Sequence, residues 1–350
     1  FNTNGFMNIG VRVAASDKIG TGHLKRCISL SLEIKENLDV DVIFFFSGDD
    51  RYLDLLKKHD LAFHKIKSNT FNYLDDANLL KSIVNKNNIE LSFIIVDHYK
   101  IDINWEKQLS DYKIIVLDDL ANRKHHADIL IDQNLYNNYQ KRYLDLVNKG
   151  CILLLGPKYA ILNNKYKKLR KDHIRTNSYK NVLISFGGTD EFELTEQLLA
   201  KFSSCPDLDE YIFHAVITKS FKNKPLIRSY SRYENIEIYE DLDCLSNLMY
   251  ECDFSIGAGG TTTWERFAMK LPAIVIAIAE NQVESANHLK KKGFINFIGS
   301  ATDLPKDWVE NIIYIMKDKI NLERQSKKIS QIVDAEGTKR IINSIKNLIS

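Results

Sequence analysis

The sequence predicts an α/β protein with two Rossmann-like domains, each built on a parallel sheet. Three observations favour this class. Apolar runs typical of parallel strands, which are buried on both faces, alternate with amphipathic stretches along the chain. The 350 residues suffice for two domains of ordinary size. Three glycine-rich turns, at 20–23, 186–190 and 255–265, each follow an expected strand and precede an expected helix.

In the first half, residues 94–96 and 114–117 are apolar throughout, which indicates strands buried on both faces. Amphipathic stretches lie between such runs and predict helices. We expect strands at 9–15, 41–47, 62–66, 91–97, 113–117 and 127–131, and helices at 23–37, 51–59 and 75–85.

The second half continues the alternation without repeating the sequence of the first half. Pro272 precedes an apolar run and marks the start of a strand. We expect strands at 181–186, 210–217, 236–239, 254–256 and 273–279, and helices at 193–202, 242–251, 263–269, 283–292, 308–317 and from 322 to the end.

A polar segment rich in Lys and Asn, at 159–178, separates the two halves. We place the linker at 163–177, between an N-terminal domain at 7–162 and a C-terminal domain, with the C-terminal helices, at 178–350. We expect the residues before Met7 to lie outside the fold.

Composition limits the possible partners and compartments. With 48 basic against 46 acidic residues the net charge is only +2, which argues against nucleic acid as the main partner. The five cysteines form no close pair, so neither a zinc motif nor a disulfide framework is indicated. No apolar stretch reaches the length of a membrane span, and no signal peptide is evident. We therefore expect a cytoplasmic monomer that acts on a small molecule.

The glycine-rich turns predict a phosphorylated ligand held between the two halves. Residues 257–263 combine three glycines with three threonines, which let the backbone approach an anion and offer it N–H and O–H donors at the start of a helix. Glu265 follows closely enough to accept hydrogen bonds from a ribose, and the amides of Asn281 and Gln282 could reach sugar hydroxyls. For each turn, the alternative is a plain strand-to-helix connection.

His23 is the candidate general base. Its turn, 20–23, lacks the G-x-G-x-x-G spacing of a dinucleotide site. Histidine suits proton transfer at neutral pH, but a residue that merely caps the helix fits the sequence equally well. Asp97-His98-Tyr99 and Asp118-Asp119 end neighbouring expected strands, and ordinary polar loops are the alternative there. His125 and His126 are expected to be surface or core polar residues, and no ligand set predicts a metal.

These residues, in this order, resemble the PseG/SpsG-like family of hydrolases of pseudaminic acid biosynthesis, which remove UDP from UDP-2,4-diacetamido-2,4,6-trideoxy-β-L-altropyranose. Two features differ from the family pattern: Lys18 follows Ser16-Asp17, and the C-terminal extension is longer, as in spore-coat polysaccharide relatives. The resemblance rests on Ser16-Asp17 and on residues 19–26, 95–99, 117–119, 127–130, 156–162, 186–190, 257–265 and 280–282.

The resemblance implies a two-domain glycosyltransferase B architecture, with His23 as the base that activates water. It implies a sugar site with Asp17, Gly22, Lys25, Arg26, Tyr99, Asn281 and Gln282. It implies a UDP site with Gly20, Gly187, Gly188, Thr189, Asp190, Gly259, Gly260, Thr261, Thr262 and Glu265.

The expected reaction is hydrolysis of the UDP-sugar to UDP and free sugar, without metal or organic cofactor. Two alternatives remain at this stage. A glycosyltransferase would use the same donor site with a hydroxyl acceptor in place of water, in surface polysaccharide synthesis. A non-catalytic sugar-nucleotide-binding protein would keep the nucleotide turns but would not need His23.

Overall fold

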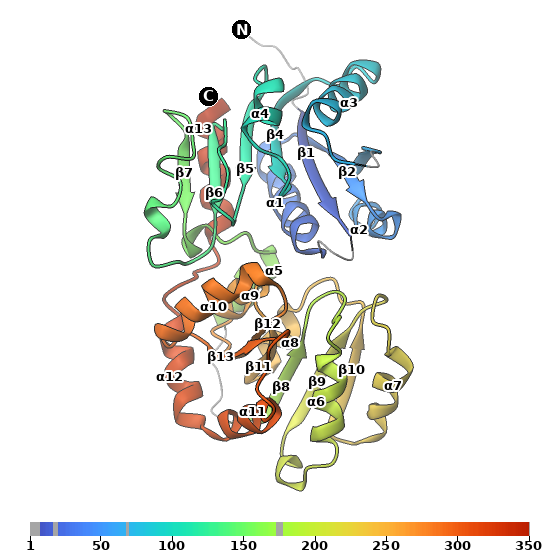
Figure 1. Cartoon of the computed structure of the whole chain (residues 1–350), viewed down its shortest axis with the longest axis vertical. Helices are drawn as coiled ribbons and strands as arrows, with labels where there is room; N and C mark the ends of the chain where they lie inside the picture. Colours follow the sequence, from blue (N-terminus) through green and yellow to red (C-terminus); the bar gives the residue numbers. More distant parts are fainter. Residues whose placement is uncertain (1–7, 17–19, 68–69, 173–177, 350) are drawn as a thin grey trace. The chain divides into compact units, whose positions relative to one another are not determined.

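The computed structural model describes residues 8–16, 20–67, 70–172 and 178–349 (Figure 1). These residues form two compact units. Unit 1 comprises the chain up to Asn134, Asn138–Ile161 and the C-terminal segment from Glu336. Unit 2 comprises Leu135–Asn137 and Leu162–Ala335.

Unit 1 is built on a seven-stranded parallel sheet in the order β3-β2-β1-β4-β5-β6-β7. Its strands are β1 (Asn8–Ala15), β2 (Asp41–Gly48), β3 (Ala62–Lys65), β4 (Leu91–Asp97), β5 (Lys113–Leu117), β6 (Ile129–Asp132) and β7 (Ile152–Leu155). Its helices are α1 (Gly22–Leu38), α2 (Leu53–Lys58), α3 (Tyr73–Lys86), α4 (Ile103–Gln108) and α13 (Gly337–Ile349).

Unit 2 is built on a six-stranded parallel sheet in the order β10-β9-β8-β11-β12-β13. Its strands are β8 (Asn181–Ser185), β9 (Ile212–Ile217), β10 (Ile236–Glu240), β11 (Phe254–Ala258), β12 (Ala273–Ala277) and β13 (Asn296–Ser300). Its helices are α5 (Asn164–Asp172), α6 (Leu194–Phe202), α7 (Lys224–Ser229), α8 (Ser246–Glu251), α9 (Thr262–Ala268), α10 (Glu280–Lys291), α11 (Trp308–Lys317) and α12 (Lys319–Ile329).

Each sheet contains one point at which the strand order reverses. In unit 1 this point lies between β1 and β4, and in unit 2 between β8 and β11. Chain connections leave in opposite directions on the two sides of such a point and open a crevice at the carboxyl ends of the strands, where α/β proteins bind ligands. The turn before His23 follows β1, and the two glycine turns of the second half follow β8 and β11.

The sheet of unit 1 is buried on both faces, because successive side chains of a strand point to opposite sides. In β4, Phe93 and Ile95 pack with α1, whereas Ile94 and Val96 belong to the core on the other face. This arrangement explains the continuous apolar run from which the strand was predicted.

The C-terminal helix packs on unit 1, which differs from the predicted domain boundary at 178–350. Ile341, Ile342 and Ile345 of α13 are fully or almost fully buried in the same core as α1. Gly337 permits this return, because a Cβ there would lie 2.3 Å from the backbone oxygen of Ala160. The amphipathic pattern predicted the helix, but it did not predict that the apolar face of the helix packs on unit 1.

Further elements differ from the sequence prediction. Helices α4 and α7 and strand β13 were not expected, and the single helix expected from 322 to the end is divided between α12 and α13. Strand β7 was not expected, because four apolar residues bounded by glycines are too short to identify from their pattern. Part of the expected linker forms α5, whose buried Tyr166 packs within unit 2.

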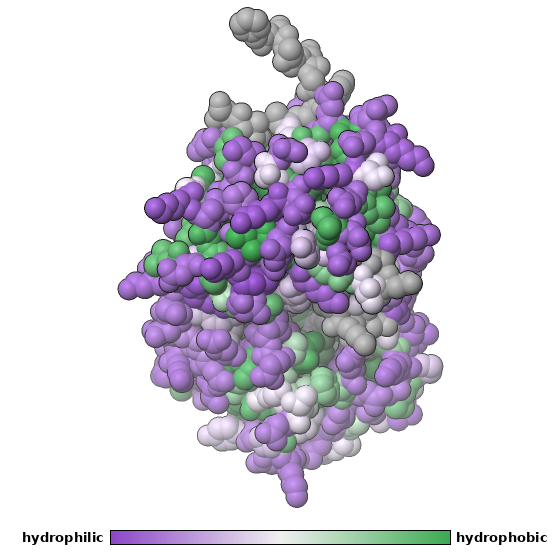
Figure 2. All heavy atoms as spheres, turned by 45° about the horizontal axis from the view of Figure 1, so that its top comes forward, coloured by the Kyte–Doolittle hydropathy of each residue, from purple (hydrophilic) through white to green (hydrophobic). Residues whose placement is uncertain are grey.

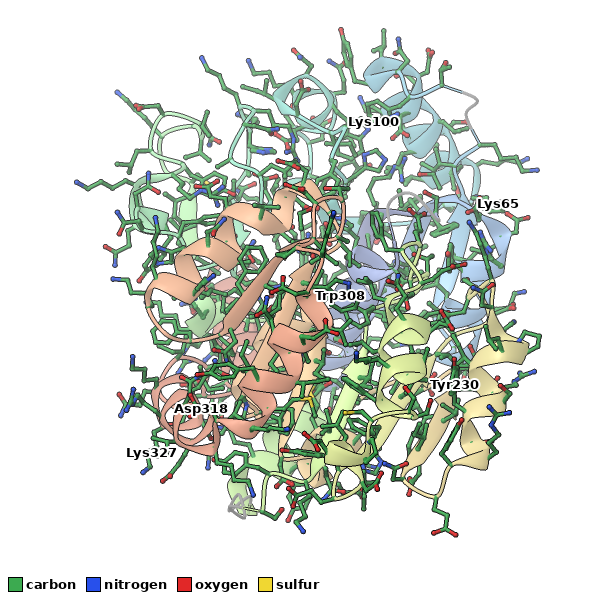
Figure 3. All side chains as sticks on the ribbon, turned by 60° about the horizontal axis from the view of Figure 1, so that its bottom comes forward. Lys65, Lys100, Tyr230, Trp308, Asp318 and Lys327 are labelled. Atoms are coloured by element: carbon green, nitrogen blue, oxygen red, sulfur yellow. The ribbon has the colours of Figure 1, made fainter. Side chains whose placement is uncertain are left out.

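The core of unit 2 includes Tyr230 and Trp308, two of the residues labelled in Figure 3. Asp318, also labelled there, begins α12 by accepting a hydrogen bond from the amide of Asn321 at 3.0 Å. Hydrophilic side chains cover most of the face seen in Figure 2. Of the helices in the described ranges, none is long and apolar enough to cross a membrane.

Candidate functional site

His23 lies at the start of α1, at the carboxyl edge of the unit 1 sheet. The preceding Gly20 has φ of 78°, a left-handed conformation that glycine adopts readily. The amide of Lys25 donates to the carbonyl oxygen of Thr21, so that the helix begins directly after this turn. His23 is only 7% exposed, which limits its ring to a few neighbours.

Asp97, the last residue of β4, orients His23. Its Oδ1 lies 2.5 Å from His23 Nδ1, and Asp97 is itself 1% exposed. When the carboxylate accepts the Nδ1–H proton, the lone pair of the neutral ring is on Nε2. The pair thus has the arrangement in which a carboxylate holds an imidazole ready to accept a proton.

Arg26 keeps Asp97 ionised. Its Nε and Nη2 donate to the two carboxylate oxygens at 2.5 and 2.6 Å, a bidentate pair. Burial acts to raise the pKa of Asp97, but the charges and hydrogen bonds of Arg26 and His23 outweigh it and hold that pKa well below its usual range. Arg26 therefore supports the histidine through Asp97, and its Nη2 also lies 3.1 Å from His23 Nδ1, whereas the sequence prediction placed Arg26 on the sugar.

Tyr99 packs against the His23 ring edge to face, with the ring centroids 4.4 Å apart. Its hydroxyl donates to Asp119 Oδ2 at 3.4 Å. Burial and the neighbouring Asp119 raise the pKa of Tyr99, so the phenol stays protonated at neutral pH and remains a hydrogen-bond donor. Tyr99 and His23, placed in different parts of the sequence, thus form one cluster.

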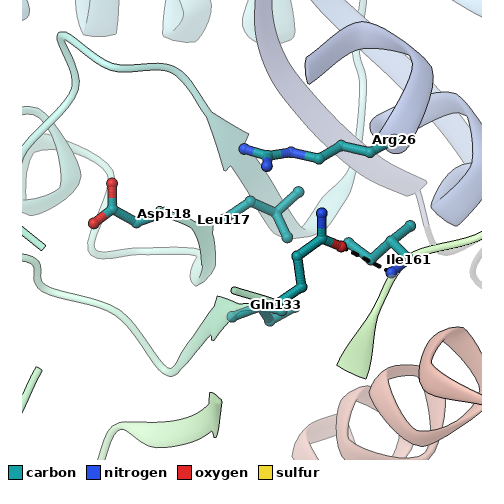
Figure 4. Close-up of a pocket in the computed structure, with 6 residues that line it drawn as sticks. Arg26, Leu117, Asp118, Gln133 and Ile161 are labelled. Carbon is teal, nitrogen blue, oxygen red and sulfur yellow. Dashed lines mark hydrogen bonds between the residues drawn. The ribbon is translucent and has the colours of Figure 1, made fainter. Parts of the chain in front are cut away.

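A small hollow adjoins this cluster within unit 1 (Figure 4). In that view the Gln133 carboxamide is held by the Ile161 amide, which donates to its Oε1 at 2.9 Å. Arg26, Leu117, Asp118, Gln133, Ile131 and Ile161 line the hollow.

Asp118 and His125 belong to a buried polar network. His125 Nδ1 lies 2.7 Å from Glu106 Oε1, and Arg123 pairs with Asp118 at 2.7 Å. Burial opposes protonation of His125, but Asp118 and Glu106 raise its pKa to about 9. The described ranges contain no cluster of three or more His, Cys, Asp or Glu side chains suited to a metal ion. These contacts connect the loop after β5 with α4.

In unit 2, the turn after β8 uses Asp190 to begin α6. The Asp190 carboxylate accepts from the amides of Leu194 and Thr195 at 3.0 and 2.9 Å, and the residue is 6% exposed. Thr218 donates its hydroxyl proton to the Gly188 carbonyl oxygen. Asp190, predicted to contact UDP, therefore has its carboxylate engaged at the helix start, while Gly187 is exposed and Gly188 and Thr189 are half-buried.

The turn after β11 approaches its neighbours closely. A Cβ at Gly257 would lie 2.0 Å from the Ser185 carbonyl oxygen, so only glycine allows β11 and β8 to pair at this point. Gly260 has φ of 80°. Gln282 of α10 lies against Gly259, since its Oε1 would be 3.2 Å from a Cβ there. The structure thus brings the predicted Asn281-Gln282 segment to the predicted phosphate turn.

Glu265 lies on α9 and is half-buried, next to Tyr166 of α5. Burial and the Glu265 charge raise the pKa of the Tyr166 phenol. Tyr166 was not singled out in the sequence, because nothing in its polar segment indicated that α5 packs on α9. Asn281 is exposed in the first turn of α10.

The predicted site residues divide between the two units. Gly20, Gly22, His23, Lys25, Arg26 and Tyr99 belong to unit 1, with Lys25 exposed on α1, and the remaining described residues belong to unit 2. Asp17 lies outside the described residues. The residue that sequence reasoning missed is Asp97 as the partner of His23. A signal existed, since residue 97 shares a strand face with 93 and 95, which pack on α1.

Comparison with known proteins defines the class of fold. Acinetobacter baumannii MurG superposes with a TM-score of 0.65 over 97% of this chain and 99% of its own, at 11% identity. Phytolacca americana UGT2, solved with UDP-2-fluoro-glucose and pterostilbene, gives a TM-score of 0.65 over 99% of this chain and 100% of its own, at 10% identity. The chain has the glycosyltransferase B fold of two Rossmann-like domains.

Comparisons of sequence also find relatives among glycosyltransferases and polysaccharide biosynthesis proteins. Residues 182–343 match the glycosyltransferase family 28 C-terminal domain. The spore coat polysaccharide biosynthesis protein SpsG of Bacillus subtilis is 22% identical over 89% of this chain and 88% of its own length. An uncharacterized protein of Methanocaldococcus jannaschii is 29% identical over 82% of this chain, and the match spans 59% of that protein.

Proposed function

We propose that this protein hydrolyses a UDP-linked 2,4-diacetamido-2,4,6-trideoxy sugar to UDP and free sugar, in nonulosonic (pseudaminic) acid biosynthesis. The observation that carries the proposal is the His23–Asp97 pair at the edge of the unit 1 sheet, with Nδ1 and Oδ1 at 2.5 Å. A protein that only bound a sugar nucleotide would have no use for an imidazole oriented in this way. The choice of sugar rests on the motifs around His23, Tyr99 and Glu265.

In the proposed reaction, His23 Nε2 removes a proton from water as the water oxygen attacks the anomeric carbon. The bond between that carbon and the oxygen of the β-phosphate breaks, and UDP leaves with the electron pair. Asp97 stabilises the imidazolium that forms, and Arg26 keeps Asp97 available by holding it ionised. Tyr99 packs against the ring and would line the sugar site.

UDP would bind at the two glycine turns of unit 2. Gly187, Gly188 and Thr189 after β8, and Gly259 to Thr262 after β11, flank the point where the strand order reverses. Backbone N–H and threonine O–H groups there would hold the diphosphate, and Glu265 would accept from the ribose. Asp190 would contribute by maintaining the shape of the first turn.

The test is to incubate the purified protein with UDP-sugars, with and without acceptor alcohols, in ¹⁸O-labelled water. We expect release of free UDP without an acceptor, and label on the free sugar. Label in UDP would mean attack at phosphorus and would contradict the proposed role of His23.

A glycosyltransferase of surface polysaccharide synthesis is the second candidate. The match of residues 182–343 to the glycosyltransferase family 28 C-terminal domain favours it, as does the relative named for spore coat polysaccharide biosynthesis. The same experiment separates the two functions, because a transferase releases UDP at an appreciable rate only when an acceptor is present.

A further inference from the structure

Arg266 of α9 is fully buried, and no carboxylate in the described part of the chain forms an ion pair with it. Its side chain is 0% exposed, and its Nη1 donates to the Ala258 carbonyl oxygen at 2.8 Å. Among the described residues, no acceptor partners its Nε or Nη2. A buried charge left this way is costly, so its retention calls for an explanation.

Arg12, another fully buried arginine, shows the ordinary arrangement. Its Nε and Nη2 donate to the two oxygens of Asp76 at 3.0 and 2.6 Å. That guanidinium is neutralised by a buried carboxylate, as buried charges usually are. Arg266 departs from this pattern within the same protein.

The position of Arg266 points to an anion. Its Nη2 would lie 2.7 Å from a Cβ at Gly257, and the Ser185 carbonyl oxygen would lie 2.0 Å from the same Cβ. The guanidinium therefore lies at the carboxyl ends of β8 and β11, directly behind the two glycine turns that continue from them.

The hydrogen bond to Ala258 also orients the second turn. The peptide bond that follows Ala258 is trans, so its N–H group, which belongs to Gly259, points opposite to its carbonyl. Because the carbonyl is directed at Arg266, the Gly259 N–H is directed away from the guanidinium. Arg266 thus places a positive charge next to the turn after β11 and fixes the direction of the Gly259 N–H group.

We propose that Arg266 is a positioning residue of the nucleotide site, whose buried positive charge makes the turns of unit 2 selective for a diphosphate over an uncharged nucleoside. The inference rests on the proposed binding of UDP to these turns. Burial lowers the pKa of Arg266 to about 10, with Glu265 opposing, and the group remains charged at neutral pH. Because the guanidinium is fully buried, solvent screens its electrostatic effect on the turns only weakly.

The experiment compares the affinities of UDP, UMP and uridine by titration calorimetry. In Arg266→Met we expect UDP binding to weaken by about tenfold or more, while uridine binding changes by less than about twofold, because only phosphate feels the lost charge. Arg266→Lys keeps the charge and should recover most of the UDP affinity. Equal weakening of UDP and uridine in Arg266→Met would overturn the proposal and leave Arg266 a structural residue.

Arg170→Met is the matched control. Arg170 also donates to a main-chain carbonyl of α9, that of Ala268, and to Ser330 at 2.7 Å, but it lies at the other end of the helix. We expect this variant to change the melting temperature without changing the ratio of uridine to UDP dissociation constants. The same selective loss in Arg170→Met would also overturn the proposal.

A measurement on the unmodified protein tests the inference even if the variants do not fold. The ¹⁵N signal of Arg266 Nε should shift on saturation with UDP and stay unchanged with uridine, and an unchanged signal with UDP would contradict the inference. If the unmodified protein binds no UDP, the proposed function itself fails. If it binds UDP but Arg266 neither shifts nor discriminates, only the role of Arg266 fails.

Discussion

At the scale of single residues, the proposed chemistry depends on a chain of contacts from Arg26 through Asp97 to His23. Each link is short and buried. Arg26 keeps Asp97 ionised, and Asp97 orients the ring. Substitution of His23 should therefore affect turnover, and substitution of Asp97 should affect the pH dependence of stability.

The His23→Phe variant should lose UDP-sugar turnover by ~10² to 10⁴, the usual contribution of a general base. Its affinity for UDP should stay within a few fold, because the predicted nucleotide residues belong to unit 2. Steady-state rates and calorimetric titration with UDP measure the two effects. His59→Phe, at a half-buried residue directly after α2, is the control. Near-normal turnover in His23→Phe would remove this residue from the mechanism.

In the Asp97→Asn variant, the free energy of unfolding should depend less steeply on pH in the acid range than in the unmodified protein. The folded-state pKa of Asp97 is depressed, so its stabilising contribution is complete above the unfolded-state pKa of about 3.9 and is lost as the pH falls through the folded value. The substitution also removes the bidentate partner of buried Arg26 and leaves it the longer 3.4 Å pair with Asp119, which costs up to roughly 3–5 kcal/mol. Denaturant unfolding between pH 7 and 2 measures both. The exposed Asp54→Asn is the control, and an unchanged pH slope in Asp97→Asn would count against the ion pair.

The Glu265→Ala variant should bind UDP more weakly, by roughly 1.5–3 kcal/mol for each hydrogen bond lost to the ribose. Since Glu265 also lies next to buried Tyr166, some loss of stability is expected as well. Titration with UDP alongside a melting curve separates the two roles. A lowered melting temperature with unchanged UDP affinity would leave Glu265 a structural residue.

At the scale of elements, the two glycine turns of unit 2 depend on how closely β8 and β11 pair. The φ of Gly257 is not positive, so the backbone conformation does not require glycine there. Glycine is required because a Cβ would collide with the Ser185 carbonyl oxygen of the neighbouring strand. The same absence of a side chain accommodates the Arg266 guanidinium.

The Gly257→Ala variant should therefore destabilise unit 2 by about 1–3 kcal/mol or more, as overpacking does. It should also weaken UDP binding, because the strands that position both turns must separate. Gly10→Ala in β1 is the matched control, since a Cβ there meets only side-chain atoms at 3.2 Å or more. Thermal melting of the two variants measures the difference, and equal tolerance of both would contradict the close approach of β8 and β11.

At the scale of the whole molecule, the chain leaves unit 1 after Ile161, forms unit 2, and returns at Glu336 to complete unit 1 with α13. Unit 1 therefore depends on residues at both ends of the sequence. Substitutions in α13 should affect unit 1, although unit 2 precedes this helix directly in the chain.

The Ile345→Ala variant should destabilise unit 1 by about 2–5 kcal/mol, because its side chain is fully buried against the α1 side of the sheet. Hydrogen exchange should report faster opening of α1 and β1 with little change in unit 2. Ile320→Ala, at a side chain that is 72% exposed, is the control. Faster exchange confined to unit 2 would contradict the assignment of α13 to unit 1.

The sequence by itself determined the class of fold, most of the strands, and the turns at which chemistry-bearing residues gather. These features follow from local rules: apolar runs identify buried parallel strands, and glycine turns between a strand and a helix lie at the carboxyl edge of a sheet. His23 was identified for the same reason, although the sequence could not separate a base from a helix cap.

Only the tertiary structure decided which distant residues meet. Asp97 lies 74 positions from His23 in the sequence. Its position on the strand was a signal, but only the fold shows that its carboxylate faces the His23 ring and Arg26. The boundary of the units was decided in the same way, because α13 is equally amphipathic wherever it packs, and the apolar surface of unit 1 determined its place. Nothing in the sequence singled out Arg266, and only the fold shows that it is fully buried with its Nε and Nη2 unpartnered among the described residues. Burial and pairing between distant segments are properties of the folded chain, and local sequence patterns do not encode them.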